Sequence, residues 1–250
     1  MRVFVSYRRA DSSPTAHTVT RALERSPVGG EPCEVFIDVD KIPLGTDFTR
    51  VLKMAMESCD IALEIVGRNW LVTDGRRRLD DANDFVRAEV RQAIREKVPL
   101  LAVLVDGAML PNRSELPGDI RALVDSRVVR LDDETFDDSI EELLSVVGGI
   151  GRRPGRAPAP ATVRFVTDGH IGFPYSGDQR HVQVDGETVG TLVSGAETAI
   201  MVPAGEHSVR LGRGMLWSPP VAVTLGGGET ATLAYKIRGL GKASLRRIGR

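Results

Sequence analysis

The sequence predicts two folded parts: an α/β domain built on a parallel sheet flanked by helices, and after it a small all-β sandwich. In the first 150 residues, short apolar runs alternate with segments of helical periodicity, as in a sheet covered by helices. Beyond residue 161, short segments alternate apolar and polar residues without a long helical period. Net charge and glycine content change at the same place, from −7 and nine glycines in residues 1–150 to +6 and 17 glycines in residues 151–250.

Five apolar runs in the first part are predicted to be its strands: residues 3–6, 35–37, 61–66, 100–105 and 128–131. Strands that are apolar on both faces are typical of a parallel sheet between two helical layers. Ligands of such sheets bind outside the carboxyl ends of the strands. We therefore expect a functional site in the residues that follow Ser6, Ile37 and Val66.

Helices are expected between these strands. Residues 46–58 place Phe48, Val51 and further apolar side chains on one face at helical spacing. Residues 84–96 repeat this pattern through Val86 and its apolar neighbours. Both segments are therefore predicted to be amphipathic helices that pack on the sheet.

A segment rich in glycine, proline and arginine separates the two parts, which is typical of a linker. The expected organisation is an α/β domain over residues 1–147, a linker over 148–161, a β-sandwich over 162–236 and a basic tail over 237–250. Residues 236–250 carry six basic and no acidic residues, so we expect a solvated tail or, alternatively, contact with an anionic partner. Asp185 and Gly186, between two predicted strands, indicate a hairpin.

Composition argues against several classes of protein. The longest apolar runs are far shorter than the roughly 20 residues of a membrane-spanning helix, and the N-terminus lacks the pattern of a secretory signal, so we expect a cytoplasmic protein. Cys33 and Cys59 each lie next to an apolar segment, and the four histidines show no ligand spacing, which predicts buried thiols and no metal site. The first part has a net charge of −7, whereas a nucleic-acid-binding domain is typically basic, so we expect no nucleic-acid partner.

The residues that follow the predicted strands argue against two other classes of α/β protein. A dinucleotide-binding dehydrogenase would carry the pattern G-x-G-x-x-G after the first strand, where residues 7–10 read YRRA. A response regulator would carry a phosphorylatable aspartate after the third strand, where residues 66–68 read VGR.

Segments in order along the first part resemble the motifs of TIR domains. They are residues 3–12 (VFVSYRRADS), 35–45 (VFIDVDKIPLG), 55–60 (AMESCD) with 67–71 (GRNWL), and 84–90 (DFVRAEV). The first resembles the strand and turn that open the family's fold, and the second resembles its second strand and BB loop. The resemblance implies a flavodoxin-like parallel sheet flanked by helices.

TIR domains similar to this one, from bacteria, plants and an animal axon-degeneration enzyme, cleave the bond between nicotinamide and ribose in NAD+. The resemblance implies an NAD+ nucleosidase that needs no cofactor, with NAD+ as its substrate and Glu89 as its catalytic carboxylate. Glu89 lies four residues after Phe85, where many relatives have tryptophan. The product, ADP-ribose or a cyclic isomer, is left open, and a role in bacterial antiphage defence or signalling is implied.

Substrate-binding residues are expected near Glu89, largely from their positions near strand ends and their side-chain chemistry: Tyr7, Arg8, Arg9, Ser12, Asp38, Phe48, Trp70 and Phe85. Plainer interpretations stand beside these roles. The arginines could form surface salt bridges to Asp11 or Asp38, Ser12 could cap the next helix, and Phe48 and Trp70 could be packing residues. Glu89 could be an exposed helix residue paired with Arg91.

The predicted BB loop is a candidate assembly surface, comprising Lys41, Ile42, Pro43, Leu44 and Gly45. The resemblance implies self-association in which this loop completes the site of a neighbouring subunit, although its apolar side chains could also pack on their own domain. The alternative function is a non-catalytic TIR scaffold that assembles with other TIR domains. Glu89 argues against it, because scaffolds of that kind typically lack this glutamate.

Two segments of the second part resemble PEGA-type β-domains, in which a hairpin precedes a Pro-x-Gly-x-His turn. They are residues 182–190 (VQVDGETVG) and 202–209 (VPAGEHSV). A domain of this kind could hold a ligand or a protein partner, and no cluster of polar residues selects between them.

Overall fold

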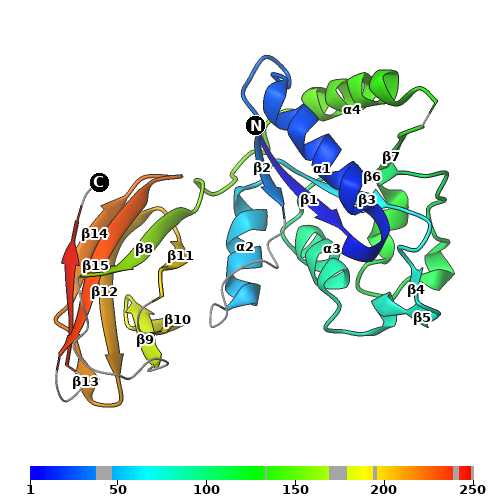
Figure 1. The fold of residues 1–250 in the computed structure, drawn as a ribbon. Helices are drawn as coiled ribbons and strands as arrows, with labels where there is room; N and C mark the ends of the chain where they lie inside the picture. The colour runs from blue at the N-terminus through cyan, green and yellow to red at the C-terminus, as the bar shows by residue number, and fades with distance from the viewer. Residues whose placement is uncertain (38–46, 133, 169–178, 194–195, 239–241, 249–250) are drawn as a thin grey trace. The chain divides into compact units, whose positions relative to one another are not determined.

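The computed structural model describes the chain except for residues 38–46, 133, 169–178, 194–195, 239–241 and 249–250. The chain divides into two compact units, shown as a ribbon in Figure 1. The first comprises Met1–Asp40 and Ala55–Ala157, and the second comprises Lys41–Met54 and Pro158–Arg250. Each is described by itself below.

The first unit is built on a five-stranded sheet in which every neighbouring pair is parallel. Its strands are β1 (Arg2–Tyr7), β2 (Glu34–Ile37), β3 (Ile61–Val66), β6 (Leu100–Leu104) and β7 (Arg127–Arg130). Their order across the sheet is β2-β1-β3-β6-β7. Each strand overlaps one of the five predicted runs, so the predicted parallel sheet is confirmed.

Four α-helices alternate with these strands: α1 (Arg9–Arg25), α2 (Phe48–Ser58), α3 (Phe85–Arg95) and α4 (Phe136–Ile150). Shorter elements follow β3 and β6, namely β4 (Val72–Thr73), β5 (Arg76–Arg77) and the 3-10 turns η2 (Arg78–Asp80), η3 (Arg113–Glu115) and η4 (Arg121–Asp125). Asp84 caps α3, because its side chain accepts a hydrogen bond from the backbone N–H of Arg87 at 3.1 Å. This cap fixes the N-terminal end of α3 at Asp84.

The two faces of the parallel sheet pack against different helices (Figure 1). One face joins α1 and α4 in a core that includes Val5, Leu63 and Leu143. The opposite face joins α3 in a second core that includes Val66 and Val90. Because side chains alternate along a strand, neighbours in the sequence of β1 and β3 belong to opposite faces.

Residues 148–157 of the predicted linker belong to the first unit, and the boundary between the two units lies between Ala157 and Pro158. Helix α4 runs through Gly148 to Ile150, because Gly148 allows a close approach to Gly29: an added Cβ would lie 3.0 Å from the backbone nitrogen of Gly29. Further along, the backbone N–H of Ala157 donates to the carbonyl of Glu57 at 2.9 Å. The segment up to Ala157 is therefore bound to the first unit.

Arg153 holds this segment in place. Its guanidinium donates to the carbonyls of Cys59 (2.8 Å), Glu96 (2.8 Å), Met56 (2.9 Å) and Glu57 (2.6 Å). These carbonyls lie at the ends of α2 and α3, where backbone acceptors lack partners within the helix. Arg153, which lies in the predicted linker, thus binds the carbonyl groups at the C-terminal ends of two helices.

The second unit holds two sheets. One has the order β10-β9-β12-β13, with β14 paired to β12, and the other has the order β11-β8-β15-β16. The strands are β8 (Ala161–Thr167), β9 (Gln179–Val184), β10 (Glu187–Val193), β11 (Thr198–Val202), β12 (Gly205–Arg213), β13 (Leu216–Trp217), β14 (Val221–Leu225), β15 (Thr230–Arg238) and β16 (Lys242–Arg247). β15 and β8 are parallel and the other pairs are antiparallel. Both sheets contribute to one core, which includes Phe165, Val182 and Tyr235, as expected of a sandwich.

Two expectations about this unit can be compared directly with the structure. The predicted hairpin is confirmed: Asp185 and Gly186 join β9 to β10 with φ of 54° and 88°. The solvated tail is wrong for residues 242–247, which form β16 and pair with β15. The physical reason is that apolar residues alternate with polar and basic ones along this segment. Ala243 is buried and Leu245 packs on the core, as on the inner face of a strand.

Candidate active site

The floor of the candidate site is a pair of polar residues on two neighbouring strands, in the halves of these strands that lead to their carboxyl ends. Ser6 of β1 and Glu64 of β3 are register partners, and Glu64 is also paired with Ala102 of β6. They alternate with residues of the α1 and α4 core, so both side chains belong to the α3 face. Only 3% of Ser6 and 1% of Glu64 are exposed to solvent.

Glu89 of α3 lies directly over this floor. The Ser6 hydroxyl donates to Glu89 Oε2 at 2.6 Å, a length typical of a charge-assisted hydrogen bond. Glu89 is 8% exposed, so the interpretation of this residue as an exposed helix glutamate is wrong. Arg91, the base that could have paired with it, instead forms an ion pair with Asp119 at 3.5 Å.

Glu64 is a component of the site that the sequence analysis missed. The indole N–H of Trp70 donates to Glu64 Oε1 at 2.6 Å, whereas Oε2 is buried and has no hydrogen-bond partner among the described residues. Burial raises the pKa of this carboxyl to about 7, against the smaller lowering effects of Ser6, Trp70 and Arg8. A signal was present in the sequence, because a glutamate interrupts the otherwise apolar run IALEIV.

An ion pair between Arg8 and Asp84 fixes the start of α3. The guanidinium donates Nη1 to Asp84 Oδ2 at 3.0 Å, Nη2 to Oδ1 at 3.2 Å and Nε to the carbonyl of Trp70 at 2.9 Å. Both side chains are buried, with 7% and 4% of the residues exposed. The pair links the end of β1 to the N-cap of α3, and Glu89 lies in the next turn of that helix. Arg8 thus positions the site, with neither Asp11 nor Asp38 as its partner in this pair.

Asp11 and Ser12 lie at the same carboxyl edge. Asp11 Oδ1 accepts from the backbone N–H of Asn69 at 2.7 Å, and Asp11 packs so closely on Gly67 that an added Cβ there would lie 2.3 Å from Oδ2. Ser12 is 1% exposed, lies at a kink in α1 and has a hydroxyl without a hydrogen-bond partner among the described residues. The hydroxyl is buried, and no hydrogen bond shows it capping a helix.

Four other predicted site residues, Trp70, Tyr7, Arg9 and Phe85, differ in their surroundings. Trp70 is buried and bonded to Glu64, which supports its interpretation as a packing residue. Tyr7 belongs to the core on the α1 and α4 face, where its ring meets His17 edge to face at 5.8 Å, so it is not grouped with Glu89. Arg9 and Phe85 are exposed, with Phe85 51% exposed and one turn before Glu89.

Phe48 begins α2 and is half-buried. Asp38 and the predicted assembly residues Lys41, Ile42, Pro43, Leu44 and Gly45 lie outside the described residues. The assignments of these residues to substrate binding and to assembly stay predictions.

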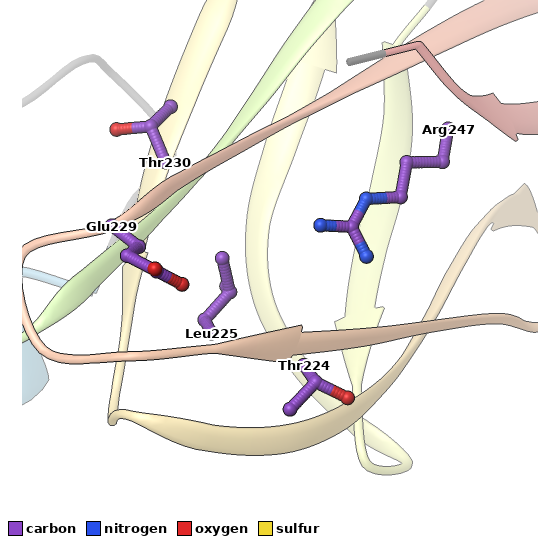
Figure 2. A pocket seen from close by; sticks show the side chains of 5 residues that line it. All are labelled: Thr224, Leu225, Glu229, Thr230 and Arg247. Carbon is purple, nitrogen blue, oxygen red and sulfur yellow. The ribbon is translucent and has the colours of Figure 1, made fainter. Parts of the chain in front are cut away.

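A separate pocket of about 420 Å³ lies in the second unit. Figure 2 shows its lining by Thr224, Leu225, Glu229, Thr230 and Arg247, from β14, β15, β16 and the turn before β15. Glu229 accepts a hydrogen bond from the backbone N–H of Gly226 at 2.8 Å. None of the candidate active-site residues lines this pocket.

No group of three or more His, Cys, Asp or Glu side chains is arranged to hold a metal ion among the residues that the structure describes. No helix within the described ranges is long and apolar enough to cross a membrane.

Comparison with known proteins gives a family match for the first unit. Residues 3–144 match the model of a family described as "TIR domain". No curated protein matches the chain. The similarity of the second part to PEGA-type domains stays a prediction, because the family match ends before it.

Three solved structures resemble the chain at 17% sequence identity each. They are a Clostridium botulinum CMP N-glycosidase, BcmB (TM-score 0.33, 57% of this chain and 98% of that chain), a prokaryotic SEFIR domain (TM-score 0.37, 61% and 94%), and the TIR domains of the activated Roq1 resistosome recognising the effector XopQ (TM-score 0.33, 60% and 85%). At such identities and scores these likenesses say nothing about activity.

Proposed function

The chain belongs to the TIR-domain family, whose model matches residues 3–144 of its 250, and from this premise we propose that it cleaves the bond between nicotinamide and ribose in NAD+. The observation that carries the proposal is the hydrogen bond of 2.6 Å between Ser6 and the buried carboxylate of Glu89. It holds the Glu89 carboxyl near the carboxyl ends of β1 and β3, the region where ligands of parallel α/β sheets bind.

The chemistry of this bond suits such a site. Nicotinamide leaves as a neutral molecule from a pyridinium that is already cationic, so no acid has to protonate it. The ribose develops positive charge as the bond breaks, and a carboxylate beside the ring stabilises that charge. Burial strengthens the effect, because the effective dielectric around Glu89 is lower than in water.

The geometry supports Glu89 in this role in two further ways. The ion pair of Arg8 with Asp84 fixes the start of α3, which limits the freedom of a carboxylate in the next helical turn. Phe85, on the same face of α3 by its spacing of four residues, is 51% exposed and offers a flat apolar surface for a substrate ring. Arg9 and Ser12 are the polar contacts that we propose for the remainder of the nucleotide.

Self-association and a role in antiphage defence or signalling are part of the proposal and rest on the family resemblance, and a cytoplasmic location is proposed with them. The predicted loop 41–45 would supply the contact between neighbouring subunits. The second unit would then serve as a module for a ligand or protein partner. Its predicted likeness to PEGA-type domains is compatible with either use.

The experiment that tests the proposal is mass spectrometry of NAD+ incubated with the full chain over a wide range of protein concentration. We expect free nicotinamide together with ADP-ribose or a cyclic isomer, and a rate per molecule that rises as the chains assemble. NAD+ that remains intact at concentrations where the chain is assembled would contradict the proposal and favour a non-catalytic scaffold.

A further inference from the structure

Glu64 is a buried carboxyl that the proposed chemistry does not use. It is 1% exposed, and its β6 partner across the sheet is Ala102. Burial of an ionised carboxylate without full pairing costs several kcal/mol. An apolar residue at this position would continue the strand, so the carboxyl calls for an explanation other than stability.

The hydrogen bonds around Glu64 have a direction. Trp70 can only donate, and its indole N–H is given to Glu64 Oε1 at 2.6 Å. Ser6 has a single hydroxyl proton, and this proton is given to Glu89 Oε2 at 2.6 Å. Towards Glu64, its partner across β1 and β3, the Ser6 oxygen can therefore only accept.

We infer that Glu64 is a positioning residue which, in its protonated form, donates its carboxyl proton to Ser6 and thereby directs the Ser6 proton onto Glu89. The resulting chain of donors runs from Trp70 through Glu64 and Ser6 to the catalytic carboxylate. It gives a partner to Glu64 Oε2, the buried oxygen that otherwise has none among the described residues. The consequence for catalysis rests on the proposed function, whereas the hydrogen-bond chain itself does not.

The surroundings of Glu64 favour the protonated form near neutral pH. Burial raises its pKa to about 7, against the smaller lowering effects of the nearby Ser6 hydroxyl, the hydrogen bond from Trp70 and the charge of Arg8. Asp84 raises the pKa slightly and is itself paired with Arg8. Glu89 is another ionisable group beside Ser6. An ionised Glu64 would compete with Glu89 for the hydrogen bond from the Ser6 hydroxyl.

Ionisation of Glu64 should therefore weaken the site. Above pH 7 two carboxylates would compete for the one proton of Ser6, and Glu89 would lose its fixed orientation. If only the form with protonated Glu64 is active, a pKa of 7 predicts a fall in kcat of about 30-fold between pH 6 and pH 8.5.

The first arm of the test reads the hydrogen-bond chain without any turnover. The chain has two tryptophans, so Trp217→Phe leaves Trp70 as the only indole. We expect its ¹H–¹⁵N indole resonance to titrate with a midpoint near pH 7, and Glu64→Gln in the same background to abolish this titration. An indole resonance that is flat between pH 5 and pH 9, or that titrates equally in Glu64→Gln, would overturn the inference.

The second arm measures nicotinamide release from NAD+ against pH. Glutamine keeps the carbonyl acceptor for Trp70 and the donor for Ser6, so Glu64→Gln should retain kcat within about threefold at pH 6 and lose the decline above pH 7. Glu64→Ala should lower kcat with little change in KM. Glu142→Gln, a change on the exposed surface of α4, is the control and should keep the wild-type profile.

The two arms separate the failure of the inference from the failure of the proposed function. Identical pH profiles for the wild type and Glu64→Gln would overturn the positioning role even if NAD+ is cleaved. If no variant cleaves NAD+ at any pH, the proposed function fails, and the indole titration still decides whether Glu64 is the protonated member of the chain.

Discussion

On the face of the parallel sheet that α1 and α4 cover, β1, β3 and β6 contribute apolar side chains to a continuous core, among them Val5, Leu63 and Val103. On the opposite face, the same central strands place Ser6 and Glu64 under α3. One face of the sheet thus has an apolar core, and the other face buries two polar side chains at paired positions of neighbouring strands.

This difference separates stability from function. An apolar face is explained by the removal of its surface from water, which contributes about 25 cal/mol per Å². Two buried carboxyls, Glu64 and Glu89, and a buried ion pair gain nothing comparable, because desolvation of charge offsets most of their mutual attraction. Sites of this kind persist where their chemistry is used, and the predictions below test whether that holds for the α3 face.

The largest effect is expected from Glu89→Gln, which keeps the shape and an acceptor for Ser6 but removes the charge. Loss of one preorganised electrostatic group typically lowers kcat by about 10²–10³-fold. Glu142→Gln on α4, which covers the other face of the sheet, should leave the rate unchanged. Nicotinamide release, followed by chromatography, is the measurement, and equal rates for the two variants would remove the distinction between the faces.

The next effect is on stability and concerns the buried pair of Arg8 and Asp84. Asp84→Ala leaves a buried guanidinium without its carboxylate, which should lower the free energy of unfolding by about 3–5 kcal/mol. The unfolding of the first unit can be followed through Trp70 fluorescence in urea in a Trp217→Phe background.

A matched pair in the second unit provides the control for this prediction. Arg246 binds Asp168 in the same bidentate way, at 2.9 and 3.0 Å, but both side chains are substantially exposed. Asp168→Ala should therefore not change the unfolding midpoint of its unit measurably. Equal destabilisation by the two aspartate substitutions would show that burial is not what distinguishes the pairs.

A smaller effect is expected from the pH dependence of stability at Glu64. Its pKa is raised in the folded protein from an ordinary 4.5 to about 7, so the folded state holds a proton that the unfolded chain has lost. The contribution of Glu64 to stability should be largest below pH 4.5 and should decline as the pH rises through 7, by at most about 3 kcal/mol. Glu64→Gln should lack this decline, so its advantage over the wild type should grow between pH 4.5 and pH 8 in urea unfolding. A constant difference would contradict it.

The strands and the site differ in how far the sequence predicts them. Continuous apolar runs predicted the five parallel strands, because burial on both faces leaves that pattern. The two-residue hairpin at Asp185 and Gly186 was also predictable, because few residues adopt positive φ. Family resemblance, and not periodicity, pointed to Glu89.

The remainder depended on pairing between distant residues. Arg8 and Asp84 are 76 positions apart, and nothing local shows that they meet. Glu64 stood out only as a charge within an apolar strand, and its role became visible with Ser6 on the neighbouring strand. The contacts of Arg153 and the strand β16 could not be predicted, because both lie in segments rich in glycine and basic residues, a composition typical of linkers and tails.

Binding of NAD+ on the α3 face can be measured residue by residue in ¹H–¹⁵N spectra of the Glu89→Gln variant titrated with NAD+. The variant should bind NAD+ without consuming it. We expect shifts at Ser6, the Trp70 indole and Phe85, with resonances of the α4 core such as Leu143 unchanged. Shifts confined to the α1 and α4 face, or the absence of shifts at millimolar NAD+, would contradict it.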